Sequence, residues 1–124
     1  MNKAEFQSLP PDLQRDVRLA VAIGWPLSNM SVSLEILQVS EPGMLRYFQP
    51  TRDRSIWAGL LEAFEVNIAP RGHSQRYESI EGYEVWVGCY WESCLSVIHE
   101  HLPTAIVEYI IRRDPLGHLS RSGL

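Results

Sequence analysis

The sequence has no long apolar run and little cysteine, and its basic residues are outnumbered by acidic ones. No segment of the 124 residues approaches the roughly 20 apolar residues that a membrane-spanning helix needs. The N-terminal stretch MNKAEFQSLPPDLQRD also has no apolar core of signal-peptide length. We therefore expect a cytoplasmic protein with no membrane partner.

The net charge is −4, because 15 acidic residues outweigh 11 Lys and Arg. Proteins that bind DNA or RNA neutralise backbone phosphates with many basic side chains, and this chain has no such excess. We expect no direct nucleic-acid partner. A small anionic ligand is compatible with the charge, since one or two well-placed arginines are enough to bind it.

Cys89, Cys94, His99 and His101 are the only residues whose spacing resembles a metal-ligand set. A Cys-x4-Cys pair followed by His-x-His is loosely compatible with zinc, but structural zinc sites usually place two ligands in a tight knuckle. The cysteines instead lie on opposite sides of a predicted hairpin turn. We predict no metal site, and we expect free thiols in a reducing compartment.

No catalytic motif is present. Nucleophilic catalysis needs a Ser or Cys beside a base that a third group holds in place, and Ser96 with His99 forms no such motif. A glycine-rich phosphate loop is also missing, because Gly82 and Gly88 stand apart. We predict that the protein is not an enzyme and uses no cofactor.

The length and composition favour a single domain over residues 1–124. A hydrophobic fraction of 45% with 21% charged residues is ordinary for a globular protein and is enough to form one core. Residues 1–10 and 116–124 carry weak patterns, and we expect them to be frayed ends.

Three helices are predicted from apolar periodicity and end signals. The first covers 11–23, and the second covers 53–63 with Asp53 as its N-cap. The third opens at Pro103 and ends at Asp114. The segment 25–49 has a mixed pattern that we interpret as weakly β or irregular.

Three strands are predicted from alternating apolar residues at 64–70, 83–90 and 95–100. Short connections between the last two favour an antiparallel hairpin. The fold class expected is α+β, with a three-stranded or larger antiparallel sheet packed with three helices.

Aromatic and arginine residues are the candidate ligand-binding groups. Trp86 and Tyr90 share the strand face opposite the aliphatic one, and flat rings of this kind stack on bases. Arg52, Arg54 and Arg112 could bind phosphate or carboxylate through their guanidinium groups. Core packing is the likelier use for about half of the aromatic residues, and most arginines are simply solvated.

Four short segments resemble the phage ABA-sandwich domain family: AIGW at 22–25, PTRD at 50–53, YEVWV at 83–87 and LPTAI at 102–106. The layout is also similar to the Thoeris anti-defence proteins of phages, which assemble into oligomers and sequester cyclic ADP-ribose-type signals. This resemblance implies a phage- or prophage-encoded, non-catalytic homo-oligomer in the bacterial host cytoplasm. Its partner would be a small nucleotide-type ligand.

Other functions remain open. A phage protein could instead inhibit defence by occluding a host protein, such as a CRISPR effector, through direct protein contacts. The remaining alternatives are a metal-dependent enzyme that uses the Cys and His group, and an accessory domain that only associates with itself.

Overall fold

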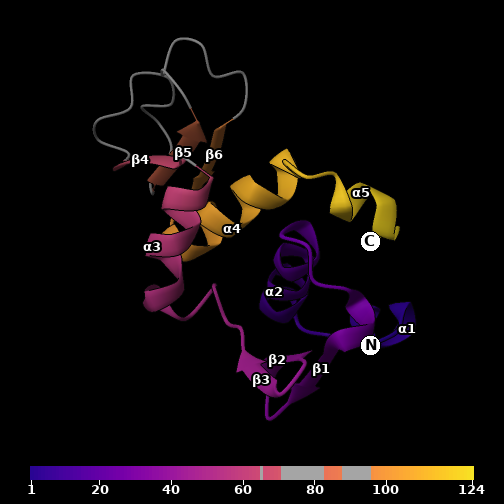
Figure 1. Cartoon of the computed structure of the whole chain (residues 1–124). Coiled ribbons are helices and arrows are strands. Elements are labelled where there is room, and N and C mark those ends of the chain that lie inside the picture. Colours follow the sequence, from indigo (N-terminus) through magenta and orange to yellow (C-terminus); the bar gives the residue numbers. More distant parts are fainter. Residues whose placement is uncertain (65, 71–82, 88–95) are drawn as a thin grey trace.

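The structure is a computed structural model of the whole chain and describes residues 1–64, 66–70, 83–87 and 96–124. It is an α+β fold, as predicted, with helices and antiparallel sheets (Figure 1). The helices are α1 (Lys3–Gln7), α2 (Pro11–Ala22), η1 (Leu27–Asn29, a 3-10 turn), α3 (Arg54–Ala63), α4 (Leu102–Arg113) and α5 (His118–Ser122). The strands are β1 (Met30–Ser33), β2 (Ile36–Glu41), β3 (Met44–Tyr47), β4 (Val66–Pro70), β5 (Tyr83–Val87) and β6 (Ser96–His99).

The predicted C-terminal sheet is present as an antiparallel meander in the order β4-β5-β6. Trp86 lies in the central strand, where it pairs with Asn67 on one side and Ser96 on the other. The strand β4 begins at Val66 and not at Phe64, because Phe64 ends α3 by donating its backbone N–H to the Leu60 carbonyl.

A second antiparallel sheet, in the order β1-β2-β3, occupies most of the segment 25–49. We expected this segment to be weakly β or irregular, and the structure gives it regular strands. The turn between β1 and β2 places Leu34 and Glu35 at φ of 52° and 62°. Such values favour glycine or asparagine, and this turn has neither. The sequence therefore carries no hairpin signal here.

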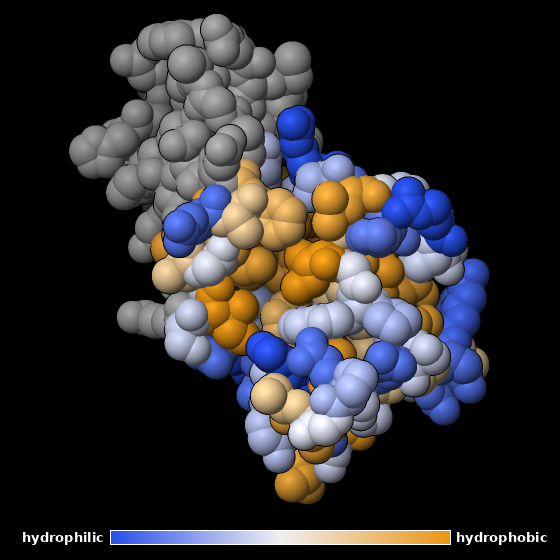
Figure 2. All heavy atoms as spheres, viewed as in Figure 1, coloured by the Kyte–Doolittle hydropathy of each residue, from blue (hydrophilic) through white to orange (hydrophobic). Residues whose placement is uncertain are grey.

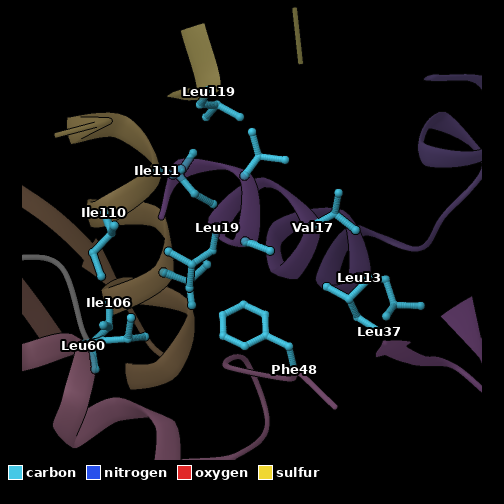
Figure 3. Packing of buried hydrophobic residues seen from close by; sticks show 14 of the residues in the cluster. Leu13, Val17, Leu19, Leu37, Phe48, Leu60, Ile106, Ile110, Ile111 and Leu119 are labelled. Atoms are coloured by element: carbon cyan, nitrogen blue, oxygen red, sulfur yellow. The ribbon is translucent and has the colours of Figure 1, made fainter. Parts of the chain in front are cut away.

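The elements form successive layers in the order C-terminal sheet, α4, α2 and N-terminal sheet (Figure 1). The two central helices pack on each other through side chains such as Leu19 and Ile110, and Leu60 of α3 lies beside Ile106 (Figure 3). Eight residues of α4 are buried, so the helix predicted to open at Pro103 lies in the interior. None of the helices in the described part of the chain is long and apolar enough to cross a bilayer.

Both ends of the chain form short helices where we expected frayed segments. The α1 helix begins with a capping box between Asn2 and Glu5, and the N-terminal amine of Met1 donates to the Met30 carbonyl at 3.0 Å. At the other end, Leu119 of α5 is buried. Asp114 accepts from the backbone N–H groups of Leu119 and Ser120, which holds α5 in place.

Candidate functional site

A cleft of about 720 Å³ opens where the loop before α3 meets the first turn of α4. Its size is within the range of small-molecule sites, which is roughly 300–1,000 Å³. We use "the cleft" for this site. The side chains that give it its chemistry are those of Asp12, Thr51, Arg52, Trp57, Glu100 and His101.

The loop 49–53 is held on α2 by the buried carboxylate of Asp16. Thr51 donates its backbone N–H and its hydroxyl to the two Asp16 oxygens, each at 3.1 Å. Asp16 and Thr51 are each 2% exposed. Burial raises the pKa of Asp16 to about 6, although the two hydrogen bonds from Thr51 oppose this shift.

The same loop is tied to α3 by the indole of Trp57, whose Nε1–H donates to the Pro50 carbonyl at 2.8 Å. This bond fixes the orientation of a half-buried aromatic ring in the cleft. Arg52 follows Thr51 and is exposed, with its backbone N–H bonded to the Gln49 carbonyl. The loop therefore presents the guanidinium group of Arg52, and the first turn of α3 presents the indole of Trp57, to the same space.

His101 is the N-cap residue of α4 and also lines the cleft. Its Nδ1 lies 2.8 Å from the Thr104 hydroxyl, and its backbone N–H donates to His99 Nδ1 at 2.9 Å. The first contact occupies Nδ1, so within the described part of the chain Nε2 is the ring nitrogen left for a ligand. Pro103 lies at N2, where a missing N–H costs the helix nothing.

The cleft carries charges of both signs. Arg52 provides the positive charge, and Asp12 and Glu100 provide carboxylates. Asp12 is partly neutralised by Arg15, which lies 3.0 Å away and also pairs with Glu108 of α4 at 2.8 Å. A ligand with an anionic group as well as hydroxyl or amino donors would match this arrangement.

The predicted ligand residues do not all lie in one place. Arg52 lines the cleft. Arg112 is near the other end of α4, about 15 Å from its first turn at the α-helical rise, and lies 3.9 Å from Glu108. Arg54 is the first residue of α3 and Trp86 is in β5, but only their backbones are described. Tyr90 lies outside the described residues.

The structure describes only two of the four possible metal ligands. Cys89 and Cys94 lie outside the described residues, whereas His99 and His101 make the local contacts given above. Within the described ranges, no group of three or more His, Cys, Asp or Glu side chains is arranged to hold a metal ion.

Sequence reasoning missed Thr51, Trp57 and His101 as residues of one site. Trp57 lies on the apolar stripe of its helix, and this pattern predicts a core residue. The contact between Thr51 and Asp16 joins two polar residues of different segments, and no local pattern predicts such a pair. Asp16 itself lies between apolar positions of α2, which is the one signal of an unusual buried carboxylate.

In comparisons with known proteins, no protein-family model, curated protein or solved structure matches the chain. The chemistry of the cleft is therefore the basis on which a function can be assigned.

Proposed function

We propose that the protein is a non-catalytic binding protein that captures a small nucleotide-type ligand in the cleft. The observation that carries this proposal is that Arg52, Trp57 and His101 line one cleft together with two carboxylates. A guanidinium group and an imidazole are phosphate-binding groups, and an indole provides apolar surface for a base. Carboxylates such as that of Glu100 accept hydrogen bonds from ribose hydroxyls, as in dinucleotide-binding proteins.

The rigidity of the loop 49–53 supports capture at equilibrium. Asp16 fixes the loop on α2, and the bond between Trp57 and Pro50 fixes it on α3. A binding group that is already in place loses less conformational entropy when the ligand arrives, so more of the contact energy appears as affinity.

The biological setting that we propose comes from the resemblance to the phage ABA-sandwich and Thoeris anti-defence proteins. In that setting the protein is phage- or prophage-encoded and acts in the bacterial host cytoplasm as a homo-oligomer. It inhibits antiviral defence by sequestering a cyclic nucleotide-type signal. Sequestration needs tight binding without turnover, which agrees with a rigid cleft.

Calorimetric titration with cyclic ADP-ribose isomers and cyclic dinucleotides tests the proposal. At least one of these ligands should bind the wild-type protein, and Arg52→Gln should weaken that binding by tenfold or more. A lost charge-assisted hydrogen bond costs about 1.5–3 kcal/mol, which corresponds to this change.

Arg113→Gln is the matched control, because Arg113 is an exposed arginine at the far end of α4 and its loss changes the net charge equally. It should leave affinity within twofold. If no ligand in the panel produces heat, or if both variants weaken binding equally, the nucleotide proposal fails.

A second candidate is occlusion of a host protein, and exposed apolar residues of the N-terminal sheet favour it. Leu34, Met44, Leu45 and Tyr47 are 90%, 54%, 49% and 63% exposed. Apolar surface is visible at the lower tip of the molecule, where this sheet lies (Figure 2). Pull-down from host lysate would give one stoichiometric protein partner, lost in Leu34→Ser and kept in Arg52→Gln, if this candidate is correct.

A further inference from the structure

A second site lies between α3 and the edge strand β3, and it shares no lining residue with the cleft. It is a space of about 440 Å³, here called the hollow, and its lining is mostly apolar. Two faces of the chain form it. One is the apolar face of α3, which contributes Ile56, Gly59 and Leu60. The other is formed by Trp25 and by the segment Arg46, Tyr47 and Phe48.

The aromatic wall of the hollow is fixed in position. The rings of Trp25 and Phe48 meet edge to face, with centroids 4.9 Å apart and an interplanar angle of 89°. The Trp25 indole N–H donates to Glu41 at 3.1 Å, which prevents the ring from rotating away. Tyr47, 63% exposed, adds a third ring at the rim. Aromatic rings of this kind are favourable neighbours for another planar ring.

Gly59 is the feature that points to an occupant. It lies in the middle of α3, where glycine destabilises a helix relative to alanine. A Cβ atom placed there would meet no described atom within 4 Å, so the chain's own packing does not require glycine. Glycine at this position leaves the helix backbone open to the close approach of a ligand.

Arg46 gives the hollow a positive charge at its rim. Its Nε–H donates to the Glu41 carboxylate at 2.8 Å, and the side chain is 52% exposed. Its terminal amino groups have no hydrogen-bond partner among the residues that the structure describes. The bond to Glu41 therefore orients the guanidinium group and leaves its outer edge to a ligand anion.

We infer that the hollow is a binding site for a planar aromatic molecule that carries a carboxylate. The ring lies on Gly59 and Ile56 and against the wall of Trp25, Tyr47 and Phe48, while the carboxylate pairs with Arg46. The volume suits a compound of one or two fused rings, and an apolar lining with one charged group is typical of small-molecule sites.

Indole-3-acetate is a suitable probe, and neutral indole tests the role of the charge. Titration followed by two-dimensional ¹⁵N NMR should shift the Trp25 indole and Gly59 amide resonances, with saturation. Indole should bind at the same resonances at least fivefold more weakly. Arg46→Gln should remove this preference while it keeps the binding of neutral indole.

Gly59→Leu tests the hollow directly, because the new side chain fills it and also favours the helix. The variant should bind indole-3-acetate at least tenfold more weakly and have a higher melting temperature, so the loss cannot be attributed to unfolding. Ala58→Leu, at the adjacent exposed position outside the hollow, should bind as the wild type does.

The outcomes are separable from those of the nucleotide proposal, because Arg52→Gln should leave indole-3-acetate binding unchanged. Resonance shifts confined to residues of the cleft would overturn the inference. Affinity that is equal in wild-type protein and Gly59→Leu would overturn it as well, as would an absence of shifts up to millimolar probe.

Discussion

The cleft and the hollow both take part of their lining from residues 48–60, but they differ in what holds them. The cleft is organised by a buried polar contact between Asp16 and Thr51, and its ligand-facing arginine, Arg52, is exposed. The hollow is organised by aromatic packing of Phe48, which belongs to the core. Arg52 can therefore be replaced with little effect on stability, whereas a change at Phe48 reaches the core.

Phe48→Ala should produce the largest effect. Phe48 is 5% exposed and packs edge to face on Trp25. Truncation of a buried Phe typically costs about 3–5 kcal/mol, which is a large part of a domain's stability. Urea unfolding measures the loss. Tyr47→Ala, one residue earlier and 63% exposed, is the control and should change stability by less than about 0.5 kcal/mol.

A core role for the hollow's wall would be refuted if Phe48→Ala and Arg52→Ala had equal effects on the free energy of unfolding. Arg52→Ala should stay within about 0.5 kcal/mol of wild type, because Arg52 is at the surface.

Asp16 should make stability depend on pH in a direction opposite to that of most carboxylates. Burial raises its pKa from 3.8 to about 6, so the folded state binds the proton more tightly than the unfolded state does. The stabilisation is complete below the unfolded pKa and is lost as pH rises through about 6. The shift corresponds to about 3 kcal/mol.

Two variants separate charge from hydrogen bonding at Asp16. Asp16→Asn can still accept from the Thr51 N–H and can donate to the Thr51 hydroxyl, so it should remove the pH dependence and stabilise the protein at pH 7. Asp16→Ala leaves a buried N–H without a partner, which costs about 1–3 kcal/mol relative to Asp16→Asn. Thermal unfolding between pH 4 and pH 7 measures both. An unchanged pH profile in Asp16→Asn would contradict the assignment.

Gly59→Ala should have the smallest effect and the opposite sign. A Cβ atom at Gly59 meets open space, and alanine favours a helix over glycine by about 1 kcal/mol. The variant should therefore be more stable by about that amount in urea unfolding. Ala58→Gly, at the next position of the same helix, should lose a similar amount. A destabilised Gly59→Ala would show that the hollow is part of the packed core.

Local signals predicted much of the fold. Asp53 as an N-cap predicted the start of α3, and its carboxylate does accept from the Ser55 N–H. Pro103 and Asp114 likewise marked the ends of α4, to within one residue. The segment 25–49 was predicted to be only weakly β or irregular, because the turn at Leu34 and Glu35 has positive φ without glycine or asparagine.

The sites could not be predicted in the same way. The guanidinium group of Arg52 makes it a candidate for binding an anion, and the structure places it in the cleft. Its neighbours there, Trp57 and His101, reach it only through the packing of α3 against α4. Gly59 gives no signal either, because a glycine within a helix has the same appearance in a sequence whether or not a ligand lies over it.

The strand β3 has a consequence for the behaviour of the protein at high concentration. It is at the edge of its sheet, all four of its residues are exposed, and three of them are Met44, Leu45 and Tyr47. An open apolar edge is a template for intermolecular strand pairing and aggregation. Arg46 is the one charged residue in this strand, and a charge at an apolar edge opposes such pairing. Its replacement by an apolar residue should therefore reduce solubility before it affects the fold.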